Sequence, residues 1–156
     1  MYKYLLILLV VLSACTKQEK ILHSQIIKNW KFEFQGTWHK ATVPGNNFSD
    51  LLNHNFIPDP FYGTNEDSVQ WVANKNWHYK SVFSVDEITL KRQKQFLVFN
   101  GLDTYAKVYL NDSLILVADN MFRKWEVDVK GILQRKNFLE IQFESVSEIE
   151  KKKQTI

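Results

Sequence analysis

Short stretches in which apolar and polar residues alternate recur along most of this chain, with turn residues between them. In the stretch 28–34, Trp30, Phe32 and Phe34 occupy every second position. The same period recurs in four later stretches, residues 79–85, 105–110, 125–129 and 139–143. A period of two is that of a β-strand, and no stretch shows a long helical period. The pattern predicts an all-β sandwich of about seven short strands.

Three further segments refine this prediction. The uninterrupted apolar run 96–99 predicts a buried central strand, and the stretch 79–85 carries apolar residues in both alternating sets, which predicts a strand covered on both sides. Asn111-Asp112-Ser113 predicts a hairpin turn between two strands. Asn47 or Ser49 is expected to cap one or two helical turns.

Composition limits the possible function classes. The chain has 156 residues, a length typical of one domain, and 45% of its residues are hydrophobic and 24% charged, which excludes disorder. The formal net charge of +3 is small, and basic residues do not interleave with aromatic ones as in a nucleic-acid groove. We therefore expect no nucleic-acid partner.

The N-terminal residues resemble a bacterial lipoprotein signal. Lys3 precedes a short apolar run, and Leu12-Ser13-Ala14 leads into Cys15, the single cysteine of the chain. A run this short with these flanks is typical of a secretory signal, and the resemblance implies lipid attachment at Cys15. The alternative is a thiol on an N-terminal anchor helix. If Cys15 is the first mature residue, the fold cannot depend on intrachain disulfides.

These observations divide the chain into four predicted segments. They are a signal peptide over 1–14, a tether over 15–25, the β-sandwich over 26–146 and a charged tail over 147–156. The expected location is the bacterial cell envelope, periplasmic or at the cell surface. The lipid at Cys15 would attach the chain to the membrane there.

The stretch 57–79 combines five aromatic residues and two prolines, and we expect it to form an ordered loop with little regular structure. Its side chains suit a sugar-binding wall, because Trp and Tyr rings stack on the C–H faces of sugars while polar groups bind the hydroxyls. They equally suit a cap on the core or a domain interface, since aromatic residues dominate both. The candidate carbohydrate-binding or interface residues are Asp59, Asn65, Glu66, Trp71, Trp77 and Arg123. Arg123 is expected to pair with Glu66 or Asp67.

Catalytic chemistry has no recognisable motif in this sequence. The four histidines are scattered, so we expect no metal, and no nucleophile elbow or phosphate loop is present. A glycosidase needs two facing carboxylates, and the sequence alone identifies no such pair. We assign no catalytic residue and no cofactor.

Several longer motifs stand in a fixed order along the chain. They are V-P-G from Val43, I-P-D-P-F-Y-G-T-N-E from Ile57, V-Q-W-V from Val69, W-H-Y from Trp77, G-L-D-T-Y-A-K-V-Y-L-N at 101–111 and N-M-F-R-K-W from Asn120. The motif at 101–111 resembles the jelly-roll domain of the glycoside hydrolase family that holds β-galactosidases, β-glucuronidases and β-mannosidases. The other motifs more specifically resemble the N-terminal domain of β-mannosidases. The resemblance implies a galactose-binding-like jelly-roll β-sandwich.

In that family the sandwich precedes an immunoglobulin-like domain and a (β/α)₈ barrel. The resemblance implies an exo-acting enzyme that removes terminal non-reducing β-D-mannose with two glutamates of the barrel, and no residue here matches either glutamate. We therefore expect a truncated, non-catalytic piece, inactive alone, whose partner is a β-mannoside or the missing barrel. The alternative hypothesis is a stand-alone carbohydrate-binding or scaffold lipoprotein.

Overall fold

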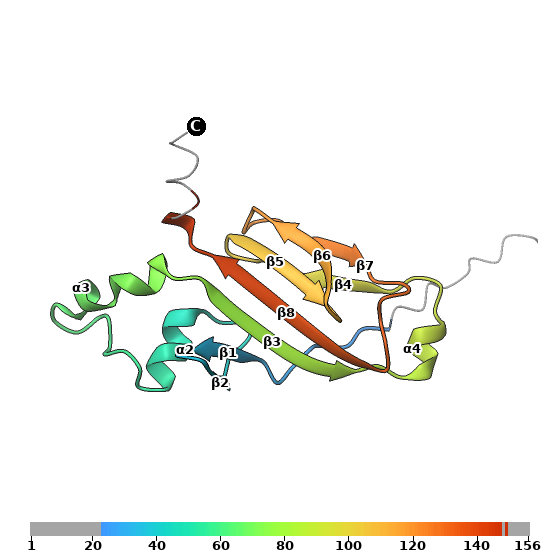
Figure 1. Cartoon of the computed structure of the whole chain (residues 1–156), viewed down its shortest axis with the longest axis horizontal. Helices are drawn as coiled ribbons and strands as arrows, with labels where there is room; N and C mark the ends of the chain where they lie inside the picture. The colour runs from blue at the N-terminus through green and yellow to red at the C-terminus, as the bar shows by residue number, and fades with distance from the viewer. Residues whose placement is uncertain (1–22, 148, 150–156) are drawn as a thin grey trace, which may run out of the picture.

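A computed structural model describes residues 23–147 and 149 of the chain (Figure 1). The predicted signal peptide, Cys15 and most of the predicted tether and charged tail lie outside these residues. Within the described part, regular strands run from Lys31 to Glu144. No helix of this part is long and apolar enough to cross a membrane.

The larger of two sheets has six strands, and every neighbouring pair is antiparallel. In spatial order they are β2 (Thr37–Lys40), β1 (Lys31–Phe34), β3 (Trp77–Ser84), β8 (Lys136–Glu144), β5 (Tyr105–Leu110) and β6 (Ser113–Ala118). The long central strands β3 and β8 pair over eight residues each, from Trp77↔Phe143 to Ser84↔Lys136. They are the two central strands of the sheet (Figure 1).

A small sheet and several short helices accompany the large sheet. Antiparallel strands β4 (Phe96–Phe99) and β7 (Trp125–Asp128) form the small sheet. The helices are α2 (Asn47–Asn53), α3 (Asn65–Val69), the 3₁₀ helix η1 (Gln70–Asn74) and α4 (Glu87–Lys91). One contiguous hydrophobic cluster joins residues of both sheets with Leu51 of α2 and Val72 of η1. The predicted β-sandwich is confirmed.

The alternation that predicts the strands also selects the residues of the core. Trp30, Phe32 and Phe34 are all buried, as are Val108 and Leu110 of β5. Because successive side chains of a strand point to opposite faces, this burial puts the apolar set of each strand between the two layers. The predicted faces of β1 and β5 are therefore confirmed.

Two strand predictions are wrong about burial. Only one face of β3 is covered. The side chains at the odd-numbered positions 77–83 are buried, whereas Val82 on the opposite face is exposed. In β4 only Leu97 is buried, whereas Phe96 and Val98 are exposed, and the strand belongs to a two-stranded sheet. A run of apolar residues predicts a strand, but it does not reveal whether both faces find a covering layer.

The predicted turn at Asn111 is confirmed, whereas the predicted helix caps are wrong, because neither Asn47 nor Ser49 is the N-cap of α2. Asn111 and Asp112 have φ of 48° and 65°, the left-handed backbone that a tight hairpin requires. The first helix is capped by Asn46, whose side-chain oxygen accepts from the Ser49 backbone N–H at 2.9 Å. The stretch 57–79 is not an irregular loop, because α3 and η1 lie within it.

Candidate interface at the aromatic segment

Residues 58–65 form a turn held by its own polar groups. The Asp59 side chain accepts from the Phe61 backbone N–H at 3.0 Å. The Asp59 carbonyl accepts from the Tyr62 N–H at 3.2 Å and from the Asn65 side-chain amide at 2.9 Å. Gly63 has a φ of 60°, which glycine adopts without strain. Asp59 and Asn65, both candidate binding residues, therefore act first as closures of this turn.

The turn presents two aromatic rings to solvent. Phe61 is 98% exposed and Tyr62 is 77% exposed. Large apolar side chains held outward on a braced turn are candidate contacts for a partner, because aromatic side chains lose little conformational entropy when a partner covers them. We call Phe61, Tyr62 and the turn that carries them the aromatic turn.

The two candidate tryptophans have different environments. Trp77 is 4% exposed and its indole N–H donates to the Val72 carbonyl at 2.9 Å, so it belongs to the core. Trp71 is 39% exposed and stacks on Phe34, with ring centroids 5.9 Å apart and planes 22° apart. Trp71 therefore combines one covered face with surface that a partner can contact.

Glu66 and Arg123 are both exposed and do not meet. Among the described residues, Arg123 forms no ion pair with Glu66 or Asp67; its guanidinium instead lies 4.2 Å from the ring centroid of Trp125. The expected ion pair with α3 is therefore absent. Arg123 belongs to the loop between β6 and β7, whereas Glu66 is in the first turn of α3.

Replacing Arg123 with alanine is expected to change stability little. The guanidinium is exposed, and an exposed cation–π contact contributes about 0.5–1 kcal/mol. Thermal unfolding of Arg123→Ala should therefore show a midpoint within a few degrees of the wild-type value. A large fall in the midpoint would show that Arg123 has a buried partner.

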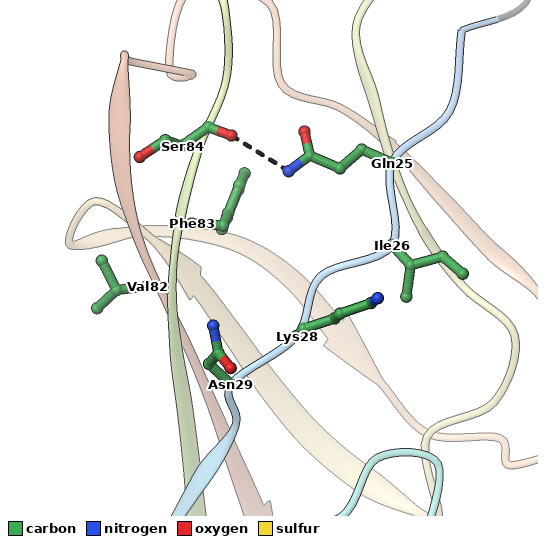
Figure 2. Close-up of a pocket in the computed structure, with 7 residues that line it drawn as sticks. All are labelled: Gln25, Ile26, Lys28, Asn29, Val82, Phe83 and Ser84. Carbon is green, nitrogen blue, oxygen red and sulfur yellow. Dashed lines mark hydrogen bonds between the residues drawn. The ribbon is translucent and has the colours of Figure 1, made fainter.

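A surface hollow of about 380 Å³ lies away from the aromatic turn, between residues 25–29 and the end of β3. Figure 2 shows its lining residues, Gln25, Ile26, Lys28, Asn29, Val82, Phe83 and Ser84. The hollow forms because β1 pairs with β3 only at Lys31 and Phe32. Before these residues, Asn29 has a φ of 60°, and the chain there does not pair with β3. None of the six candidate residues lines this hollow.

The six candidate residues do not include Phe61 and Tyr62, the two exposed rings of the aromatic turn. The sequence does contain a signal for them, because Pro58, Pro60 and Gly63 bracket both residues and predict a projecting turn. Within residues 23–147 and 149 there is also no group of three His, Cys, Asp or Glu side chains that could hold a metal ion. Around this turn the structure exposes the aromatic rings of Phe61 and Tyr62.

This architecture defines a class, a β-sandwich domain whose two sheets share one hydrophobic core. Residues 30–155 match the glycosyl hydrolase 2 galactose-binding domain-like family, and the chain belongs to that family. The predicted galactose-binding-like fold is thereby confirmed.

Among its relatives, β-mannosidase B of Thermothelomyces thermophilus is 38% identical over 124 residues, which are 76% of this chain and 14% of that protein. The β-mannosidase of Bos taurus is 36% identical over 145 residues, 90% of this chain and 16% of the relative. The crystal structure of β-D-mannosidase from Dictyoglomus thermophilum matches with a TM-score of 0.79 and 39% identity, over 82% of this chain and 16% of that one. The chain thus spans about one sixth of these relatives.

Proposed function

We propose that this chain is the N-terminal, non-catalytic domain of an exo-acting β-mannosidase, which hydrolyses terminal non-reducing β-D-mannose from β-mannosides. The observation that carries the proposal is the similarity to β-mannosidases at 36–39% identity, over only 14–16% of their length. The sequence contains no recognisable catalytic motif, and two aromatic rings are exposed on the aromatic turn. The chemistry then belongs to a barrel that this domain supports.

The aromatic turn is the part of the domain best suited to contact that barrel. Interface energy concentrates in aromatic anchors that fill pockets on a partner, and Phe61 and Tyr62 are such anchors. The turn is closed by the Asp59 and Asn65 hydrogen bonds before any partner binds, so little ordering entropy is lost on docking. The half-exposed Trp71 adds apolar surface in the same segment.

The double variant Phe61→Ala/Tyr62→Ala is expected to weaken this docking at least tenfold while leaving the melting temperature of the domain unchanged, since both rings are exposed. The measurement uses Dictyoglomus thermophilum β-D-mannosidase from which the matching segment has been removed. The chain is added to it, and hydrolysis of an aryl β-D-mannoside is followed. The chain alone should show no turnover.

Phe122→Ala is the matched control, because Phe122 is an exposed aromatic ring in the loop between β6 and β7. If Phe122→Ala weakens docking as much as the double variant, the aromatic turn is not the interface. Turnover by the isolated chain would contradict the non-catalytic assignment.

A stand-alone carbohydrate-binding or scaffold lipoprotein is the second candidate, favoured by the exposure of the same two rings, since such rings also stack on sugars. Calorimetric titration of the chain with a β-mannoside separates the two. Saturable binding that Phe61→Ala/Tyr62→Ala abolishes, without any rescue of the shortened enzyme, would favour this candidate over the barrel-supporting domain.

We also propose that Cys15 carries a lipid and that the chain is anchored in a bacterial envelope membrane. The support is the sequence itself, Lys3 followed by an apolar run and then Leu12-Ser13-Ala14-Cys15. Mass spectrometry of protein extracted from the membrane fraction distinguishes a lipidated Cys15 from a free thiol.

A further inference from the structure

The beginning of the described chain is fixed to one end of the sandwich. The Gln25 side-chain amide donates to the Ser84 carbonyl at 3.3 Å, where β3 ends. His23 lies near Asp86, the residue that caps α4. Hydrogen bonds from Thr89 hold the pKa of the Asp86 carboxyl below its usual value, and His23 adds to this effect. A chain arriving from Cys15 therefore reaches the domain beside α4.

The same end is assembled from two segments that are distant in sequence. The Lys130 ammonium donates to the carbonyls of Leu90 at 3.3 Å and Arg92 at 2.6 Å. Arg135 pairs with Glu87, and its carbonyl accepts from the Val85 N–H at 3.0 Å. The loop between β7 and β8 is thus attached to α4. In Figure 1, α4 lies at the opposite end of the domain from α3.

Positive charge dominates this surface, which we call the basic end. Its basic residues are Lys91, Arg92, Lys94, Lys130, Arg135 and Lys136, and its carboxylates are Asp86, Glu87, Asp128 and Asp112, the last in the turn that packs on residues 132–138. Three of these carboxylates have local partners: Asp86 accepts from Thr89 N, Glu87 pairs with Arg135, and Asp128 accepts from Lys130 N. Lys91, Lys94 and Lys136 are exposed to solvent.

An apolar side chain lies on the same helix as part of this charge. Ile88, in the first turn of α4, is 68% exposed, and Lys91 follows it in the last turn of the helix. An exposed aliphatic residue on a basic surface matches a lipid surface, where the basic groups meet anionic headgroups and the apolar side chain enters the interfacial region.

We propose that the basic end binds the surface of a bilayer containing anionic phospholipid. In the cell this inference rests on the proposed lipid at Cys15, although the surface itself exists without it. Eight residue steps separate Cys15 from His23, a span of at most about 28 Å, so a lipidated Cys15 keeps the basic end close to the headgroups. The orientation points the α3 end, and the aromatic turn before it, away from the membrane.

The first experiment uses the full chain with Cys15→Ser, so that no lipid can attach and failure of the proposed lipidation cannot change the result. Ile88→Cys in this background is labelled with a fluorophore that brightens and shifts to the blue in apolar surroundings. We expect this response with vesicles of equal phosphatidylglycerol and phosphatidylcholine, and none with phosphatidylcholine alone. The same label at Asp67→Cys, on α3, should not respond. Equal responses at both positions, or a response to phosphatidylcholine alone, would overturn the proposal.

The second experiment reverses charge in the same Cys15→Ser chain. The triple variant Lys91→Glu/Lys94→Glu/Lys136→Glu should reduce partitioning onto the mixed vesicles about tenfold or more. Its matched control is Lys40→Glu/Arg123→Glu/Lys124→Glu, three exposed positions outside the basic end, which should partition like the parent. Circular dichroism confirms that both variants are folded.

Two outcomes of this second experiment would overturn the inference. Equal losses in the two variants would mean that net charge, rather than this surface, governs binding. Equally tight binding of soluble polyphosphate, lost in the same triple variant, would mean that the surface accepts a free polyanion instead of a membrane.

Discussion

Trp77→Ala is expected to destabilise the domain by about 3–5 kcal/mol, because it removes a buried tryptophan side chain from the core. The indole is 4% exposed and lies 6.2 Å from the ring of Phe34 and 6.4 Å from that of Phe32. Truncation also leaves the Val72 carbonyl without the indole N–H, which donates to it at 2.9 Å. In a domain of this size we expect the thermal midpoint to fall by roughly 10 °C or more.

Two variants separate packing from hydrogen bonding at this site. Trp77→Phe keeps an aromatic ring but loses the N–H donor, so its loss should be smaller than that of Trp77→Ala. Trp71→Ala removes a ring that is 39% exposed and should cost least. Thermal and urea unfolding give the order, and a Trp71→Ala loss equal to that of Trp77→Ala would contradict the assignment of Trp77, rather than Trp71, to the core.

The fold could be predicted from the sequence because a strand with one buried face carries apolar residues at every second position. Phe32 and Phe34 occupy every second position and are buried, and Val108 and Leu110 repeat the pattern. The neighbours of each strand could not be predicted in this way. The apolar run at 96–99 predicts a central strand, yet Phe96 is exposed in a two-stranded sheet. The hydrophobicity of a residue does not reveal whether another layer of the protein covers it.

The candidate site was harder to predict, since the same polar groups can serve a ligand or the backbone. Asp59 and Asn65 have the chemistry to bind sugar hydroxyls, but their hydrogen bonds close the aromatic turn. The partner of Arg123 depends on where two distant loops lie, and the sequence contains no signal for its contact with Trp125. What the sequence does show is the turn chemistry around Phe61, from which its projection follows.

Asp50 was not singled out by any sequence pattern, yet it connects α2 to the rest of the fold. It is buried, and its carboxylate accepts from the Thr42 backbone N–H at 2.8 Å and from the Tyr79 hydroxyl at 3.1 Å. Asp50→Ala should therefore cost about 2–4 kcal/mol, because both donors lose their acceptor inside the protein. Urea unfolding measures the loss, and Asp50→Asn, which keeps an acceptor of similar shape, should lose less. Equal stability of Asp50→Ala and wild type would contradict this role.

The same carboxyl gives the stability a pH dependence whose sign follows from its burial. Burial raises the pKa of Asp50, and this effect outweighs the opposing hydrogen bonds from Thr42 and Tyr79 and the nearby charge of His54. The folded state therefore holds this proton more tightly than the unfolded state, whose pKa is about 3.9. The resulting stabilisation is complete below that value and is lost as the pH rises through the folded-state pKa.

Wild type should thus lose stability relative to Asp50→Asn as the pH rises from about 4, because the amide does not ionise. Burial and the Asp50 carboxylate also raise the pKa of Tyr79, so its hydroxyl stays protonated and remains a donor throughout this range. Urea unfolding of both proteins at a series of pH values gives the difference directly. If wild type instead gained stability relative to Asp50→Asn with rising pH, the hydrogen bonds to Asp50 would outweigh its burial, and the carboxylate would be the form that the fold selects.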